Sequence, residues 1–384
     1  MISLDRGLLG RAGSGDVVER HRRYANLAGA LDIIVFASAK YTEYHLAQNL
    51  RIFPTRSSKF SHYSKAVDLA LALNKEQAYD LLVTQDFTAP AGLRIKKYLN
   101  LPWIVNIHSM FFSRRWLGFN LVSWYLLWLV KRAIKAADGF RVNNNEIRSQ
   151  LASWGITEPI LVQPTPIDIE RFKNQGSRIK NKGERGIDVL FVGRLSPEKN
   201  VGLLIRAFKK INGGFRLIVV GQGAEATPLK RLAASDVRIE FLGQKNLEEL
   251  PEIFGGADIF VLPSNTESFG QVLLQAAASG LAILSTDTPG AREILGEGES
   301  GILVPVGSEK DLERELKNLL TKTYEREYWA KKAQDMSERY DAAAGLERTM
   351  MFWREIANTP LTSPLMRGER GGSEPHEGER KERP

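Results

Sequence analysis

Short apolar segments alternate with longer amphipathic stretches along most of this chain. Segments such as Leu31–Ala37 and Asp188–Gly193 lack polar alternation, which predicts strands buried on both faces, as in parallel sheets. Their alternation with helices favours a doubly wound α/β fold. The other predicted strands are Asp80–Gln85, Trp103–His108, Gly139–Val142, Ile160–Gln163, Phe215–Val220, Val237–Gly243, Asp258–Leu262, Leu281–Ser285 and Gly301–Val304. The helices predicted in the first half are Asp16–Gly29, Ser61–Tyr79, Pro90–Leu99 and Gly118–Ala137.

The pattern is interrupted around Pro164–Pro166, and the polar stretch Lys173–Arg185 that follows is typical of an exposed linker. We therefore predict two α/β domains with a cleft between them, in which ligands bind at the carboxyl ends of the strands. The predicted units are residues 1–165 and 166–340 for the two domains, 341–357 for a helix that packs back on the first domain, and 358–384 for a disordered tail rich in Pro, Gly, Glu and Arg.

The composition narrows the function classes. The 384-residue chain carries a net charge of +8, and it contains no cysteine, which excludes disulfides and thiolate metal sites and fits a reducing compartment. No apolar run reaches the roughly 18 residues of a membrane span. Lysine and arginine are scattered, without a basic helix carrying interleaved aromatic residues. We expect a cytoplasmic protein that does not bind nucleic acid, and peripheral contact with an anionic membrane surface remains open.

The window Pro263–Gly280, PSNTESFGQVLLQAAASG, is the most informative part of the sequence. Ser268 with Gln271 fits a capping box, which predicts a helix over Phe269–Gly280. Glu267 precedes this helix and is unsuited to bind phosphate, but it could accept hydrogen bonds from the hydroxyl groups of a sugar. The helix start itself favours an anion. The window therefore predicts a nucleotide-sugar site.

Two cations follow another predicted strand end. The buried strand Asp188–Gly193 leads directly into Arg194, and Lys199 lies five residues further along. Arginine can form paired hydrogen bonds with phosphate oxygens, and lysine acts as a point charge. We interpret Gly193, Arg194 and Lys199 as part of a diphosphate site at which the flexible Gly270 also approaches the ligand. Ordinary surface cations are the alternative.

Other candidates are less specific. Asp86 and His108 follow neighbouring predicted strands and would face the cleft, although a lone histidine at a strand end is often structural. Gly13 and Gly15 precede the first predicted helix, in a loop that either faces a phosphate or is a plain connection. Gly221–Gly223 favours a tight turn, with backbone approach to a nucleotide as the alternative.

The segment Phe111–Arg132 combines Trp116, Trp124 and Trp128 with flanking basic residues. Such a helix could rest on a membrane surface. We favour a core helix whose aromatic face is buried.

Several motifs, taken in order, resemble the second domain of the retaining glycosyltransferases of family 4. The resemblance covers residues 188–305, and the first domain is only loosely similar. The matching motifs are VGRLSPEKN (192–200), LIVVGQG (217–223), IEFLG (239–243), ADIFVLPSNTESFGQVLLQAAASG (257–280) and ILVP (302–305), after the domain-joining segment TPIDIERF (165–172).

The resemblance implies the GT-B fold, in which two Rossmann-like domains face a central cleft. It implies transfer of a sugar from a nucleotide diphosphate sugar, with retention of configuration, to a glycan, a lipid-linked molecule or another hydroxyl acceptor. No metal or other cofactor is expected. By resemblance, Arg194 and Lys199 hold the diphosphate, Glu267 contacts the donor sugar, Phe269 and Gly270 line sugar and diphosphate through their backbone, and His108 lies near the transferred sugar. The loop containing Gly13 and Gly15 resembles the family's glycine loop.

The chain departs from the family pattern at two positions. Gln275 stands where a second glutamate usually contacts the nucleotide ribose, so a hydrogen bond is retained but no carboxylate is present. Asn200 replaces a common glycine, and we expect it to cap the next helix. A nucleotide-sugar epimerase and a weakly catalytic nucleotide-sugar-binding protein remain as alternatives. A nicotinamide dehydrogenase is disfavoured because no strand ends in G-x-G-x-x-G.

Overall fold

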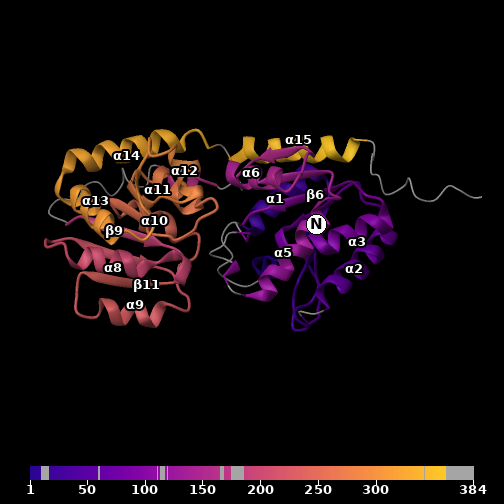
Figure 1. Ribbon diagram of the computed structural model, residues 1–384, viewed down its shortest axis with the longest axis horizontal. Helices are drawn as coiled ribbons and strands as arrows, with labels where there is room; N and C mark the ends of the chain where they lie inside the picture. The colour runs from indigo at the N-terminus through magenta and orange to yellow at the C-terminus, as the bar shows by residue number, and fades with distance from the viewer. Residues whose placement is uncertain are drawn as a thin grey trace, which may run out of the picture.

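The computed structural model describes residues 1–9, 17–58, 61–109, 111–112, 117–118, 120–164, 168–173, 186–340 and 342–359. These residues form two α/β halves, each built on its own sheet (Figure 1). The candidates Gly13 and Gly15, as well as Trp116 and residues 360–384 of the predicted tail, lie outside the described residues.

The first half contains β1 (Ile2–Ser3), β2 (Leu31–Val35), β3 (Tyr44–Ala47), β4 (Leu50–Pro54), β5 (Leu82–Gln85), β6 (Trp103–Ile107), β7 (Gly139–Val142) and β8 (Ile160–Val162). The strand order is β3-β4-β2-β1-β5-β6-β7-β8. Only the β3–β4 pair is antiparallel. Strands β3 and β4 were not predicted, because they form a short hairpin at the edge of the sheet without a long apolar run.

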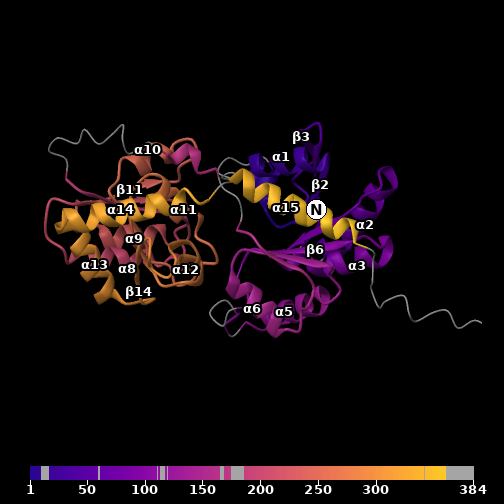
Figure 2. The same ribbon diagram turned by 90° about the horizontal axis from the view of Figure 1, so that it is seen from above.

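Helices cover both faces of this sheet (Figures 1 and 2). Side chains of a strand alternate between faces. Val83 and Ile104 therefore pack with α1 (Val17–Ala28) and α15 (Ala342–Asn358). The alternate positions, such as Trp103 and Val105, pack against the opposite layer. That layer consists of α2 (His62–Glu76), α3 (Ala89–Leu99) and α5 (Leu121–Ile134).

The second sheet contains β9 (Asp188–Val192), β10 (Arg216–Val220), β11 (Ile239–Gly243), β12 (Ile259–Leu262), β13 (Ala282–Thr286) and β14 (Ile302–Val304). All pairings are parallel, and the order is β11-β10-β9-β12-β13-β14. The strand order reverses between β9 and β12. In such sheets a ligand crevice forms at the carboxyl ends of the strands beside this reversal. The predicted doubly wound α/β class is confirmed.

The helices of the second half are α8 (Val201–Lys209), α9 (Ala226–Ala233), α10 (Leu250–Gly255), α11 (Gln271–Ala278), α12 (Pro289–Leu295), α13 (Glu309–Thr321) and α14 (Thr323–Ser337). After α14 the chain returns to the first half, where α15 lies along α1 (Figure 2). The ring of Trp353 stacks on that of Tyr24 with centroids 5.2 Å apart. Arg348 Nε donates to Gln163 Oε1 at 2.8 Å, and Arg354 Nη2 donates to Leu27 O at 3.0 Å. The C-terminal helix is thus part of the first half's core.

The segment Leu121–Ile134 differs from the prediction in the side that it buries. It is a helix, but Trp124 and Trp128 are exposed, and the buried side is aliphatic. The expectation of a buried aromatic face is therefore wrong. Among the described helices, none is both long enough and apolar enough to cross a membrane.

Candidate functional site

Two glycine-containing turns meet at the carboxyl edge of the second sheet. One turn follows β9 at Gly193, and the other follows β10 at Gly221–Gly223. A Cβ atom at Gly221 would lie 1.8 Å from the carbonyl oxygen of Gly193, and one at Gly223 would lie 2.2 Å from that of Leu195. Leu195 N donates to Gln222 O at 3.0 Å. These two glycines therefore serve the close packing of the two turns, a reason that neither sequence interpretation considered.

A cleft of about 690 Å³ opens beside these turns. Its volume lies within the range that is typical of small-molecule sites. Besides the glycine turns, its lining includes the side chains of Arg194, Gln222, Gln244, Lys245 and Leu250. Two basic groups, two amides and exposed backbone at strand ends suit an anionic ligand with polar edges. Gln244 and Lys245 were missed in the sequence, although they directly follow the recognised strand IEFLG.

Lys199 and Glu267 form an ion pair across two loops of the second half. Their side chains are 20% and 13% exposed, so the pair is partly shielded from water. Asn265 ties these loops together: its backbone N–H donates to Glu198 O at 2.7 Å, and its side-chain Oδ1 accepts from Asn200 Nδ2 at 3.2 Å. Of the two predicted cations, Arg194 is exposed, whereas Lys199 is partly buried and is held beside the carboxylate of Glu267.

Asn200 occupies the position before α8 with φ at +47°, a conformation that glycine adopts more readily. Its side chain does not cap the helix, contrary to expectation, because it bonds to Asn265.

Helix α11 begins two residues later than expected, at Gln271. The residue before it is Gly270, with φ at +74°, and no side chain caps the helix. The proposed capping box between Ser268 and Gln271 is therefore wrong. The first backbone N–H groups of the helix lack a side-chain partner, which leaves them available to an anion.

Helix α12 fixes the segment that leads into α11. Gly290 N donates to Glu267 O at 2.8 Å, and a Cβ atom at Gly290 would lie 2.5 Å from the backbone nitrogen of Phe269. Phe269 itself is buried in the core of this half. Gln275 lies one turn into α11 and is half-buried. The structure thus places Glu267, Phe269 and Gly270 on one turn that packs against α12.

Asp86 and His108 come together at the carboxyl edge of the first sheet. Asp86 Oδ1 accepts the backbone N–H of His108 at 2.9 Å and that of Ser109 at 3.4 Å. Burial raises the pKa of Asp86 to about 6, against the lowering effect of these hydrogen bonds. Burial, together with the nearby charges of Arg141 and Arg20, lowers the pKa of His108 to about 3. At neutral pH His108 is uncharged and Asp86 is largely ionised.

Consecutive asparagines after β7 connect the two halves. Asn143 Nδ2 donates to His108 O at 3.0 Å. Asn144 caps α6 (Asn145–Ser153) through its Oδ1, while its Nδ2 donates to the carbonyl oxygen of Ser268. The edge that carries His108 is therefore joined to the turn that carries Glu267. These asparagines were missed in the sequence, although the NNNE run directly follows a predicted strand.

A polar cluster lies between the first sheet and helices α1 and α15. Arg141 is buried, its Nε donates to Gln163 O at 3.1 Å, and its Nη2 has no hydrogen-bond partner in the protein. The other buried atoms of this region without a protein partner are Tyr24 Oη, Asn106 Oδ1 and Trp353 Nε1. Buried polar atoms normally bond to protein, water or ligand, so these four atoms mark a place for water or a ligand's polar group.

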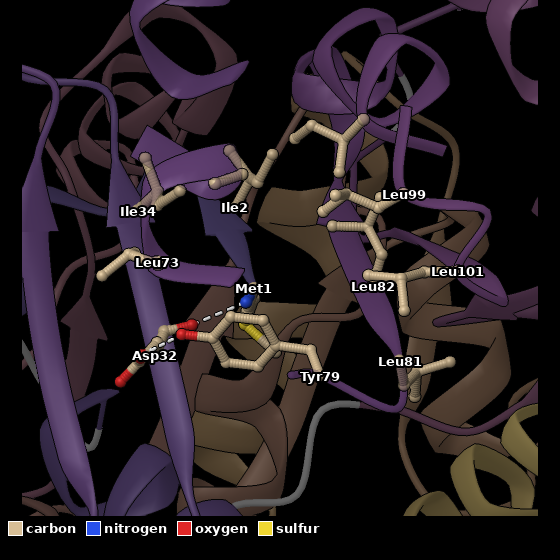
Figure 3. Close-up of a pocket in the computed structure, with 12 residues that line it drawn as sticks. Met1, Ile2, Asp32, Ile34, Leu73, Tyr79, Leu81, Leu82, Leu99 and Leu101 are labelled. Atoms are coloured by element: carbon tan, nitrogen blue, oxygen red, sulfur yellow. Dashed lines mark hydrogen bonds between the residues drawn. The ribbon is translucent and has the colours of Figure 1, made fainter. Parts of the chain in front are cut away.

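A second cavity, of about 40 Å³, lies at the opposite edge of the first sheet (Figure 3). It is lined mainly by aliphatic side chains, and Tyr79 donates a hydrogen bond to Asp32 beside it. Its volume suffices for a water molecule but not for a sugar. It therefore does not contribute to the candidate site.

Two family profiles match consecutive parts of the chain. The profile described as Glycosyltransferase Family 4 matches residues 18–171, and that described as Glycosyl transferases group 1 matches residues 172–336. The chain belongs to this glycosyltransferase family. The expected GT-B fold is likewise confirmed.

Curated relatives share part of this family member's sequence. The sulfoquinovosyl transferase SQD2 of Arabidopsis thaliana is 27% identical over 340 residues, which cover 79% of this chain and 65% of that protein. A GDP-mannose-dependent alpha-mannosyltransferase of Mycobacterium tuberculosis is 32% identical over 172 residues, covering 42% and 44%. A phosphatidyl-myo-inositol mannosyltransferase of the same species is 35% identical over 152 residues, covering 37% and 39%. The chain thus spans less than two thirds of each of these relatives.

Solved structures of GT-B proteins share the fold over nearly the whole glycosyltransferase chain. The sucrose-phosphate synthase of Thermosynechococcus elongatus superposes with a TM-score of 0.82 at 19% identity, covering 92% of this chain and 98% of that one. Anabaena Alr3699/HepE in complex with UDP-glucose superposes with a TM-score of 0.72 at 18% identity, covering 89% and 96%.

Proposed function

We propose that this protein transfers a sugar from a nucleotide diphosphate sugar to a hydroxyl acceptor, with retention of the anomeric configuration. One observation carries the proposal: Arg194, the Lys199–Glu267 pair and the start of α11 all lie at the carboxyl edge of the second sheet, where the strand order reverses. The donors named for relatives and neighbours, GDP-mannose and UDP-glucose, are nucleotide diphosphate sugars. The acceptor is a glycan, a lipid-linked molecule or another hydroxyl compound.

The donor is held mainly by the second half. The nucleotide occupies the cleft beside the glycine turns, and its diphosphate lies between Arg194 and the N-terminus of α11. Positive charge at both places stabilises the departing diphosphate. These charges make a divalent metal dispensable in the proposed mechanism, and chelation is expected to leave turnover unchanged.

Glu267 orients the sugar by accepting hydrogen bonds from its hydroxyl groups, and Lys199 holds that carboxylate in place. His108, uncharged at neutral pH, faces the sugar from the first half. In the proposed same-face reaction, the bond between the anomeric carbon and the diphosphate oxygen breaks as the acceptor oxygen bonds to that carbon. The acceptor proton passes to the departing diphosphate oxygen, so no covalent enzyme intermediate forms.

Proton NMR of the product from a candidate donor–acceptor pair tests this proposal. We expect release of nucleoside diphosphate to depend on the acceptor, and the new glycosidic linkage to keep the anomeric configuration of the donor. An inverted product contradicts retention. Acceptor-independent release of nucleotide together with a free, modified sugar supports the epimerase alternative instead.

A further inference from the structure

The outer face of α5 is apolar where it meets solvent. Its inner face packs into the core of the first half through the buried residues Leu127, Val130, Ala133 and Ile134. On the outer face, five large apolar side chains are between 48% and 83% exposed. They are Leu121, Val122, Trp124, Tyr125 and Trp128, and we call them the α5 patch.

Exposed apolar side chains are concentrated in the α5 patch. Twelve large apolar side chains are exposed among the described residues, and five of them lie within eight consecutive positions of α5. The other seven are spread over several elements of both halves. Isolated exposed apolar residues need no explanation, but a contiguous patch marks an interaction site.

The patch has the chemistry of a lipid–water interface. Tryptophan and tyrosine combine an apolar ring with a polar atom, which suits the boundary between acyl chains and headgroups. Tyr125 stacks on Trp128 with centroids 6.0 Å apart, so the aromatic groups form one surface. Positions three, four and seven residues apart share a helix face. The helical spacing therefore places Leu121, Trp124 and Trp128 on one side.

Basic residues continue the same side of the helix. The guanidinium of Arg132 lies 5.9 Å from the centroid of the Trp128 ring, and Lys135 is exposed at the end of α5. Apolar and aromatic groups followed by cations are typical of helices that lie in the interface of an anionic membrane. The net charge of +8 adds to the attraction between the protein and an anionic membrane.

We propose that α5 docks this protein on the surface of an anionic lipid bilayer. Helix α5 lies at the outer edge of the first half (Figure 2). It contacts the segment Asp86–Thr88, which carries Asp86 at the carboxyl edge of the first sheet, so docking brings this edge toward the membrane. The acceptor class is then a lipid-carried hydroxyl compound. This last step rests on the proposed function, whereas docking itself does not.

Vesicle flotation of the full chain tests the docking. The vesicles contain phosphatidylcholine and phosphatidylglycerol in equal parts. The double variant Trp124→Ser/Trp128→Ser removes the two tryptophans without touching the buried side of α5. We expect its partition coefficient to fall by at least about tenfold, because two ring surfaces no longer leave water. Tyr324→Ser/Tyr328→Ser, a stacked pair of exposed aromatic residues on α14, is the matched control and keeps wild-type binding.

A charge variant separates the ionic contribution to vesicle binding from the apolar contribution. Arg132→Gln/Lys135→Gln is expected to weaken binding to the mixed vesicles and to leave the weaker binding to pure phosphatidylcholine unchanged. High salt has the same effect as this variant, since screening acts on the ionic contribution alone.

Three outcomes overturn the proposal. The first is wild-type protein that fails to float with the mixed vesicles, and the second is a tryptophan variant that floats as well as wild type. The third is concentration-dependent self-association in light scattering that the tryptophan variant abolishes, without any vesicle binding by wild type, which assigns the patch to a second copy of the chain. A donor-induced thermal shift, measured on the same variants, stays at the wild-type value if only docking is lost, so the two proposals fail independently.

Discussion

At the scale of single residues, Asp86 combines a strained backbone with a partly desolvated carboxyl group. Its φ is +44°, a conformation that non-glycine residues seldom adopt, although aspartate adopts it more often than most. Its carboxylate holds the backbone of His108 and Ser109 at the end of the next strand. Both features place a titrating group beside the predicted sugar site, which agrees with a positioning task there.

Replacement of Asp86 by Asn is expected to remove a pH dependence of stability. The folded pKa, about 6, exceeds the ordinary value of 3.8, so the contribution of Asp86 is present below pH 3.8 and is lost as the pH rises through 6. Relative to Asp86→Asn, wild type should therefore lose about 3 kcal/mol of unfolding free energy between pH 3.8 and 7. Urea unfolding of both proteins across this range measures the difference. A constant difference contradicts the assignment.

The sequence identified some site residues and not others. Arg194, Lys199 and Glu267 follow strands or precede a helix inside recognisable motifs, so local pattern was sufficient. Asn144 could not be found this way, because its role depends on Ser268, 124 residues away in the sequence. Likewise, burial of Arg141 depends on α1 and α15 closing over the same sheet face.

At the scale of secondary-structure elements, the sequence predicts that α5 is a helix but does not predict which of its sides faces solvent. The sequence of α5 is apolar all round, which is the pattern of a buried helix. Only the packing partners show that its aliphatic side faces inward and its aromatic side faces solvent. For α11, Ser268 and Gln271 have the correct capping spacing, but the left-handed Gly270 starts the helix later and Ser268 O bonds to the other half.

The contact of α12 with the turn before α11 is open to a direct test. In Gly290→Ala the new methyl group meets the backbone of Phe269, which cannot move without displacing Glu267. We expect a loss of about 1–3 kcal/mol in unfolding free energy, together with weaker donor binding. Gly214→Ala is the control, because a Cβ atom there has open space around it. Chemical denaturation and donor titration provide the measurements, and equal behaviour of the two variants counts against this packing role.

At the scale of the whole molecule, Asn144 links the two halves at the candidate site. Asn144→Asp keeps an effective helix cap but replaces the donor Nδ2 by an acceptor, which repels Ser268 O. We expect the halves to separate more readily. The radius of gyration from small-angle scattering then increases, and transfer to acceptor falls more than donor binding does. Unchanged scattering and transfer would show that this contact does not hold the halves together.

We propose that the carboxyl edge of the second sheet binds a nucleotide diphosphate sugar through Arg194. The thermal unfolding midpoint with a panel of such donors tests this for wild type, for Arg194→Ala and for the control Arg314→Ala, which removes an exposed arginine of α13. Binding to the native state raises the midpoint. We expect a shift with at least one donor in wild type and in the control, and a largely lost shift in Arg194→Ala. A panel that shifts none of the proteins, or that shifts Arg194→Ala as much as wild type, contradicts it.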